Sequence, residues 1–140
     1  MDDIYITQSF SVKEFMCHNG TPYPTDWIIP RLKPLCQALE KIRALTNQPM
    51  TIESGYRTKE WNDAIYAAKK EVPTKSKHCE GIAADIVLDG MAPHELYNAI
   101  SVLIRDKVIP NGGLGLYRWG CHYDIRCLID NEPAARWVKE

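Results

Sequence analysis

A single carboxylate, Asp85, interrupts one of the most apolar stretches of this chain, which runs from Ile82 to Leu88. An apolar run of this length, bounded by Gly81 and Gly90, predicts a buried strand. An ionised carboxylate is costly to bury unless a cation or a metal ion compensates its charge. The sequence therefore predicts a core strand that carries an acid together with a partner for that acid.

For the rest of the chain, the sequence pattern predicts helices that alternate with short strands. Ser11 and Glu14 have the spacing of a capping box, which predicts a short helix. Apolar residues at three- and four-residue steps predict longer helices, and the expected ranges are 30–45, 59–70 and 93–107. Strands are expected at 50–53, 82–88, 114–117 and 122–127, the last two as a hairpin. This order predicts one α+β domain over residues 1–140, with a small, mostly antiparallel sheet and helices packed on it.

Composition argues against several classes of partner. Seventeen basic and eighteen acidic side chains give a net charge of -1, so we expect no general attraction to nucleic acid or to anionic lipid. No apolar stretch approaches the ~20 residues that span a membrane, and the acidic start Met1-Asp2-Asp3 is unlike a signal peptide. Five cysteines without a Cys-x-x-Cys pair indicate reduced thiols in a protein made in the cytoplasm.

Two histidines are placed to join Asp85. His78 ends a loop before the apolar strand, and His122 begins a later strand. Pairing of these strands in one sheet would bring the three side chains to one face. Zinc hydrolases use three ligands drawn from His, Asp and Glu, and keep a fourth position for water. The alternative, that these histidines are structural or surface groups as expected for His18 and His94, stays open on the residues alone.

Several motifs follow one another in the order found in a known family. They are Phe10–Phe15, Ser54–Arg57, Asn62, Ser76–Asp85, Gly112–Tyr117, His122–Asp124 and Arg136–Trp137. Together they resemble the zinc D-alanyl-D-alanine carboxypeptidase family, which includes phage endolysins that cut the L-alanyl-D-glutamate bond. Its fold is shared with the hedgehog signalling domain. A chain this short, without a wall-binding module, resembles the phage or prophage branch.

The resemblance implies a role for each motif residue. His78, Asp85 and His122 would be the zinc ligands. Arg57 would bind the substrate carboxylate or carbonyl and stabilise the oxyanion, unless it is simply a paired structural arginine. Ser76 would orient substrate or cap its loop. Asn62 would hold the loop. Four aromatic residues could wall the groove or belong to the core, and they are Trp61, Tyr117, Trp119 and Tyr123.

The general base is where the sequence departs from the family. In the dipeptidase and endolysin branches an acid stands three residues before the last histidine, and here that position is Trp119. Asp124 is the favoured base, because two residues along a strand places it on the same face as His122. A role for Asp124 in orienting the His122 ring is almost equally supported. Glu80 is the second candidate for the base.

These features predict zinc-dependent hydrolysis of a peptide bond in peptidoglycan stem peptides, of D,D-carboxypeptidase or endopeptidase type. The alternatives are a non-catalytic zinc-stabilised binding module and a virion structural component. We expect a monomer that acts at the bacterial cell wall, either from within the virion or after release at lysis. The scissile bond stays open. So does the role of Cys79 and Cys121, whose place beside the two histidines is either chance or a sign of a thiolate near the metal.

Overall fold

The computed structural model describes residues 3–139, and the start Met1-Asp2, on which the signal-peptide expectation rests, lies outside them. The strands are β1 (Met50–Ser54), β2 (Ala83–Leu88), β3 (Gly113–Leu116), β4 (Cys121–Asp124) and β5 (Ala135–Val138). They form one sheet in the order β1-β2-β4-β3-β5. Only the β3–β5 pairing among these described strands is parallel. The expected α+β class, with a mostly antiparallel sheet, is confirmed.

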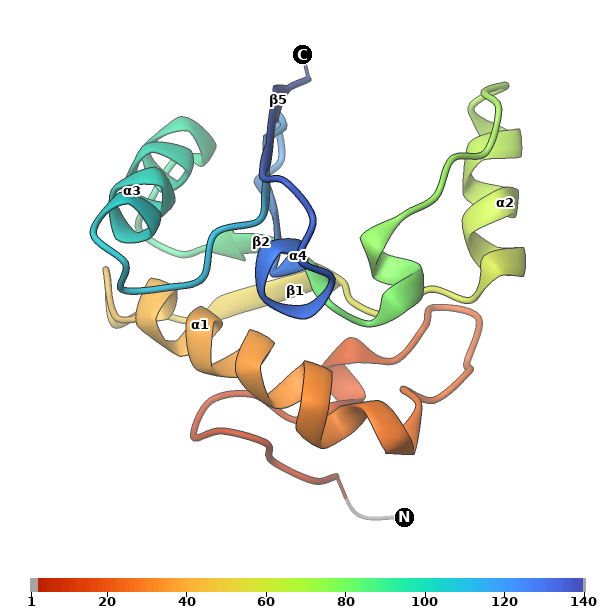
Figure 1. Ribbon diagram of the computed structural model, residues 1–140, viewed down its shortest axis with the longest axis horizontal. Coiled ribbons are helices and arrows are strands. Elements are labelled where there is room, and N and C mark those ends of the chain that lie inside the picture. The colour runs from red at the N-terminus through yellow and green to blue at the C-terminus, as the bar shows by residue number, and fades with distance from the viewer. Residues whose placement is uncertain (1–2, 140) are drawn as a thin grey trace.

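The helices surround this sheet on several sides (Figure 1). They are α1 (Lys33–Arg43), α2 (Lys59–Ala68), α3 (Pro93–Arg105) and α4 (Arg126–Ile129), with short helical turns η1 (Val12–Phe15), η2 (Thr25–Trp27), η3 (Ile28–Leu32) and η4 (Lys77–Glu80). The first turns of the helix expected at 30–45 are the wider π-type turn η3. Pro34, which has no N–H to donate to the carbonyl four residues earlier, lies two residues after this turn. Within residues 3–139, no helix has the length and apolarity that crossing a membrane requires.

The C-terminal part corrects two expectations. The strand expected at 122–127 ends at Asp124, and α4 follows at once. The Asp124 carboxylate accepts a hydrogen bond from the Arg126 backbone N–H at 3.0 Å, which turns the chain out of the sheet. The second correction is β5, which was not expected as a strand. It is only four residues long and pairs with β3 from the far end of the chain.

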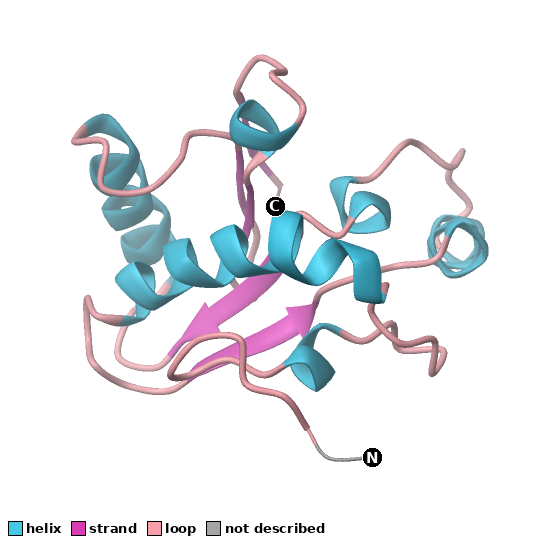
Figure 2. Ribbon diagram, turned by 60° about the horizontal axis from the view of Figure 1, so that its bottom comes forward, coloured by secondary structure: helices cyan, strands magenta, loops and turns pink. Residues whose placement is uncertain are grey.

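Helix α1 covers one face of the sheet and supplies much of the core (Figure 2). Its buried side chains repeat at three- and four-residue steps, and they are Leu35, Cys36, Ala38, Leu39 and Ile42. Full burial of a Leu or Ile side chain contributes roughly 2 kcal/mol. Helix α3 contacts β3 and β4. Apolar packing thus anchors the sheet on one side.

The strand β2 alternates between two environments. Ala84, Ile86 and Leu88 belong to the hydrophobic core, whereas Asp85 projects from the opposite face. Residues directly opposite each other in an antiparallel pair lie on the same face of the sheet. Asp85 is paired with Ser54 of β1 and with His122 of β4. The register therefore gathers polar side chains from three strands at the middle of the sheet.

Candidate metal centre

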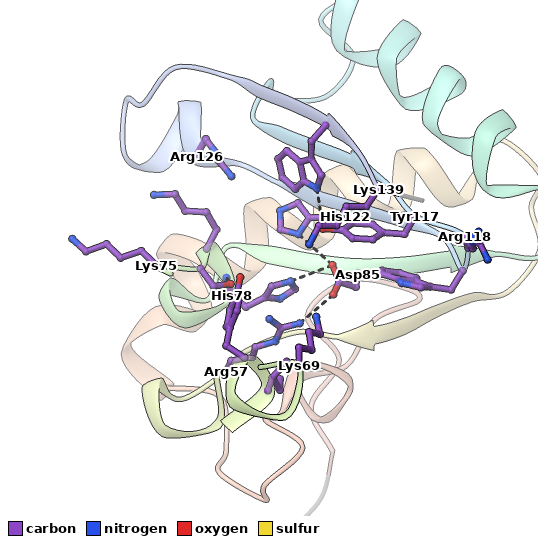
Figure 3. Close-up of a pocket in the computed structure, with 16 residues that line it drawn as sticks. Arg57, Lys69, Lys75, His78, Asp85, Tyr117, Arg118, His122, Arg126 and Lys139 are labelled. Carbon is purple, nitrogen blue, oxygen red and sulfur yellow. Dashed lines mark hydrogen bonds and ion pairs between the residues drawn. The ribbon is translucent and has the colours of Figure 1, made fainter. Parts of the chain in front are cut away.

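Three buried side chains converge beside β2, as the sequence predicts. His122 stands opposite Asp85 in the β2–β4 register, and His78 comes from η4, the turn that leads into β2. Each residue offers one ligand atom, and these atoms all lie within 4.8 Å of one another. Figure 3 shows both imidazoles directed at the Asp85 carboxylate. The three residues expected to bind a metal are therefore brought together.

In each histidine, the ring nitrogen that faces away from Asp85 forms a hydrogen bond that fixes the orientation of the ring. His78 Nδ1 donates to the Gly55 carbonyl at 2.7 Å, while His78 Nε2 lies 3.2 Å from Asp85 Oδ1. His122 Nε2 lies 2.7 Å from Asp124 Oδ2, while His122 Nδ1 lies 3.2 Å from Asp85 Oδ1. One nitrogen from each ring thus faces the same carboxylate oxygen. Two imidazoles, each hydrogen-bonded through its other nitrogen, and one carboxylate form a set of ligand atoms that fits zinc.

The electrostatics of the cluster suit a cation. Burial alone would raise the pKa of Asp85, but the neighbouring His78 and His122 imidazoles outweigh it and hold the pKa well below its usual range. Burial lowers the pKa of His78, against the opposing effect of Asp85. Burial would also lower the pKa of His122, but hydrogen bonds with Asp124 and Asp85 raise it instead. Metal ions bind ionised carboxylates and neutral imidazoles, so a metal at this cluster would compete with protons for the two histidines.

Asp124 lies behind His122 and is fully buried. Its Oδ1 accepts hydrogen bonds from the Gly113 N–H at 2.8 Å and from the Arg126 N–H and Nε at 3.0 Å each. Its Oδ2 accepts from Arg126 Nη2 at 2.8 Å and faces the His122 ring. A carboxylate with all these partners has no free oxygen for a substrate or water. Of the two roles that the sequence leaves open for Asp124, the geometry favours orientation of the His122 ring over the expected general-base role.

Glu80, the second candidate base, is held in an ion-pair network centred on Lys77. Lys77 Nζ contacts Glu80 Oε2 at 2.8 Å, Asp130 Oδ2 at 3.0 Å and Glu132 Oε1 at 2.7 Å. Burial and the neighbouring Asp130 raise the pKa of Glu80. Lys77 directly precedes His78, so this ion-pair network ties the turn carrying His78 to the segment after α4. Glu80 therefore belongs to a structural anchor.

Arg57 reaches the metal residues as the resemblance implies. Its Nη2 lies 3.4 Å from Asp85 Oδ2, and its Nε donates to Ser54 Oγ at 3.1 Å. Its Nη1 donates to Asn62 Oδ1 at 3.4 Å, and the Asn62 amide donates to the Thr74 carbonyl at 3.1 Å. Asn62 thus holds the loop before η4, as expected, and the Arg57 side chain too. The guanidinium is fixed beside the carboxylate that would bind the metal.

A cavity of about 530 Å³ opens over the metal residues. Ser76, Tyr117 and Trp119 line it, as their expected contact with substrate requires. Ser76 Oγ also accepts a hydrogen bond from the His78 N–H at 3.2 Å, which caps η4. The Tyr117 and Trp119 rings stack with centroids 4.9 Å apart and planes 18° apart. The cavity therefore has one aromatic wall next to the metal residues.

The remaining aromatic candidates divide between groove and core. Trp61 lines a neighbouring hollow of about 380 Å³. Tyr123 does not wall a groove: it is fully buried, and its hydroxyl donates to the Pro110 carbonyl at 2.7 Å. Its register partners Ala84 and Leu114 are core residues, so its side chain faces the core side of β4. Of the two alternatives that the sequence leaves for Tyr123, groove wall or core, the structure shows the core.

Glu53 is the site residue that sequence reasoning missed. The β1–β2 register shifts between Ile52, opposite Ile86, and Ser54, opposite Asp85, so Glu53 is the extra residue of a β-bulge. Glu53 and Ser54 line the second hollow together, in contact with the space beside Asp85. That hollow shares Arg57, Asp85 and Trp119 with the larger cavity. Glu53 directly precedes the Ser54–Arg57 motif, but its position in the sequence does not show that it lies at the site, because the bulge depends on strand pairing.

The two cysteines beside the histidines do not join the cluster. The metal-binding group found among the described residues holds His78, Asp85 and His122 without a thiol. Cys121 is buried on the core side, where its Sγ donates to the Pro93 carbonyl at 3.4 Å and burial raises its pKa to about 12. Burial also raises the pKa of Cys79. Both groups stay thiols at neutral pH, so the thiolate interpretation finds no support.

Comparison with known proteins gives one match. The model of a family described as Peptidase M15 matches residues 8–124, which include every residue of the candidate metal centre. Neither the curated proteins nor the solved structures contain a match to this chain.

Proposed function

Because the chain belongs to the peptidase M15 family, we propose that it is a zinc-dependent peptidase that acts on peptidoglycan stem peptides at the bacterial cell wall. The reaction is hydrolysis of a peptide bond, of D,D-carboxypeptidase or endopeptidase type. One observation carries the proposal. The ligand atoms of His78, Asp85 and His122 meet within 4.8 Å of one another, on a wall of the 530 Å³ cavity. A structural metal site would be closed to substrate, whereas a catalytic one stays open.

The residues of this cavity have distinct tasks in such a reaction. Bound zinc supplies Lewis-acid polarisation and a lowered pKa for water. The Arg57 guanidinium, fixed by Ser54 and Asn62, directs positive charge at the oxygen on which charge develops. The stacked Tyr117 and Trp119 rings hold the peptide against this centre and restrict its orientation. Asp124 keeps His122 in the orientation that the metal needs.

Proton transfer falls to Glu53 in this proposal. Asp124 is enclosed by its hydrogen bonds, and Glu80 is paired with Lys77. Glu53 is exposed, and it lines the hollow that contains Asp85 and Arg57. Its carboxylate would accept the proton of the attacking water and pass it to the leaving amine.

A non-catalytic zinc-binding module is the second candidate, and Trp119 is the observation in its favour. An aromatic residue stands there, at the position where the dipeptidase and endolysin branches of the family have an acid. A module of this kind would keep the three metal residues and would need no proton acceptor.

Digestion of purified peptidoglycan separates the two candidates. The zinc-loaded protein is incubated with cell walls of several chemical types, with and without a chelator, and the products are identified by mass spectrometry of the muropeptides. A peptidase releases amino acids or new amino termini, the chelator stops the release, and His122→Ala abolishes it. One equivalent of bound zinc without product from any wall would establish the binding module instead.

A further inference from the structure

The cavity over the metal residues is lined by a strong excess of positive charge. Among its described lining residues, Asp85 is the single carboxylate. Basic side chains line the same cavity from five separate segments, and they are Arg57, Lys69, Lys75, Lys77, Arg118, Arg126 and Lys139. The whole chain has a net charge of -1. The concentration of cations is therefore a property of this cavity and does not follow from composition.

Three of these cations are neutralised within the protein. Arg57 pairs with Asp85 at 3.4 Å, Arg126 pairs with Asp124 at 2.8 Å, and Lys77 contacts three carboxylates. The other four make no ion pair within residues 3–139, and they are Lys69, Lys75, Arg118 and Lys139. Four cations around one cavity repel each other, and a bound anion would relieve that repulsion.

The four cations stand on two sides of the cavity. Lys69 and Lys75 come from the end of α2 and the loop that follows, whereas Arg118 and Lys139 come from the β3–β4 turn and the segment after β5. In Figure 3 the labels of Lys69 and Lys75 fall on the side of Arg57 and His78, and those of Lys139 and Arg118 fall on the side of Tyr117. An extended ligand in the cavity would therefore meet positive charge along both flanks.

Stabilising interactions with neighbouring groups explain the position of only one of the four cations. Lys69 follows the last residue of α2, where a cation is favourable for the helix dipole, and its Nζ lies 5.8 Å from the Tyr66 ring centre. Within residues 3–139, no ion pair and no cation–π contact is found for Lys75, Arg118 or Lys139. The neighbouring hollow on the Glu53 side contains no lysine among its described lining residues. Lys69, Lys75, Arg118 and Lys139 thus line the larger cavity and not this hollow.

We propose that this cavity selects acidic peptides, with two or more free carboxylates that meet the cations on its two flanks, Lys69 with Lys75 and Arg118 with Lys139. This inference deepens the proposed function and rests on it for the reaction. Carboxylates form charge-assisted hydrogen bonds with these cations, whereas a primary amide in the same place brings no charge. Stem peptides with free acids are then preferred over the same peptides in amidated form.

The test uses two synthetic stem peptides of identical sequence, one with free side-chain and α-carboxylates and the other with primary amides. Equilibrium binding to the zinc-loaded protein is measured with backbone-N-methylated versions that resist hydrolysis, and kcat/KM is measured with the unmethylated ones. The free-acid peptide should bind about tenfold more tightly, and added salt should reduce the difference. Equal affinity for acid and amide would overturn the inference.

Matched double variants assign the effect to the cavity. Lys69→Gln with Lys75→Gln, and Arg118→Gln with Lys139→Gln, should each weaken binding of the acid about threefold to tenfold and leave the amide unchanged. The control is Lys33→Gln with Arg105→Gln, which removes the same charges from exposed positions on α1 and α3. An equal loss in the control would also overturn the inference.

The binding and hydrolysis measurements can refute the two proposals independently of each other. Preferential binding of the acid without hydrolysis of either peptide would remove the peptidase proposal and support acid recognition. Hydrolysis without any preference between the two peptides would support the peptidase and overturn acid recognition.

Discussion

The imidazole of His122 stands between two carboxylates, 2.7 Å from Asp124 Oδ2 through Nε2 and 3.2 Å from Asp85 Oδ1 through Nδ1. A ring that donates its Nε2 proton to Asp124 keeps an unprotonated Nδ1, which is the form that binds a metal. Asp124 is in turn fixed by Arg126 and by the Gly113 N–H. The tautomer of His122 is therefore set by the buried Asp124 carboxylate and by the two residues that hold it, Gly113 and Arg126.

Asp124→Asn tests this relationship. The amide keeps the shape but loses the charge that holds the His122 proton, so zinc affinity should fall about 10- to 100-fold. Arg126 also loses its buried partner, which should lower the free energy of unfolding by about 3 kcal/mol. Competition with a chromophoric chelator measures the affinity, and denaturant unfolding measures the stability. The control Asp63→Asn removes an acid that pairs with Lys59 on the surface of α2. Unchanged zinc affinity in Asp124→Asn would contradict the orienting role.

Glu53→Gln tests the proton-transfer assignment. Loss of a general acid–base group lowers kcat by roughly 10²-fold or more, while zinc content and KM should stay close to those of the unchanged protein. Glu60→Gln, an exposed acid in the first turn of α2, is the matched control. Measurement of kcat and KM on one peptide, with zinc content by atomic absorption, gives the result. A Glu53→Gln protein with full kcat would show that another group carries the proton.

Lys77→Met tests the anchor of the η4 turn. The Lys77 side chain is 13% exposed and contacts three carboxylates, so its removal leaves Glu80, Asp130 and Glu132 facing one another. The free energy of unfolding should fall by about 2 kcal/mol, and zinc affinity should fall because His78 is the next residue. Lys59→Met removes a lysine from an exposed pair and should change neither property. Thermal melting and zinc titration of both variants provide the comparison.

The decrease in the free energy of unfolding at acidic pH should depend on Asp124. Burial would raise its pKa, but hydrogen bonds with His122 and Arg126 hold it below the usual value of about 3.9. A carboxyl with a depressed pKa in the folded state stabilises the protein fully above its unfolded pKa, and this stabilisation is lost as pH falls below about 4. Denaturant unfolding of the metal-free protein from pH 6 to about pH 3 should show this loss. The slope should be smaller in Asp124→Asn, and an identical slope would contradict the assignment.

The metal residues were predictable because their signals are local. Asp85 is an acid inside an apolar strand, and it requires a partner wherever that strand packs. The pairing of β2 with β4 then follows from strand patterns on either side of α3. The family motifs gave the same three residues. Arg57 and Asn62 were accessible in the same way, because their positions are tied to short motifs next to β1 and in α2.

Other features depend on tertiary geometry that no local pattern encodes. Glu53 faces the site only because a bulge shifts the β1 register by one residue, and a slip of this kind leaves no mark on the alternation of side chains. The orienting role of Asp124 required its partners Gly113 and Arg126 to be placed. The short elements α4 and β5 have too few residues for any periodicity to emerge. The four cavity cations that form no ion pair within residues 3–139 lie in separate segments. Because the net charge of the chain is near zero, composition does not indicate that they gather at one place.

Gly113→Ala provides a final test of the buried support for His122. A Cβ at position 113 would collide with Asp124 Oδ2 and lie 2.7 Å from Arg126 Nη2. The Asp124 carboxylate is held on both oxygens, so it can make room only by shifting its contact with His122. Overpacking of this kind costs roughly 1–3 kcal/mol, and we expect zinc affinity to fall together with stability.

The control for that variant is Gly20→Ala, where an added Cβ meets nothing within 4 Å but the backbone has φ +93°. This substitution should cost about 1 kcal/mol of stability through backbone strain and leave zinc affinity unchanged. Zinc titration and denaturant unfolding of the two alanine variants separate strain from displacement of the ligand. A Gly113→Ala protein that binds zinc as tightly as Gly20→Ala would mean that the position of Asp124 does not control the His122 ring.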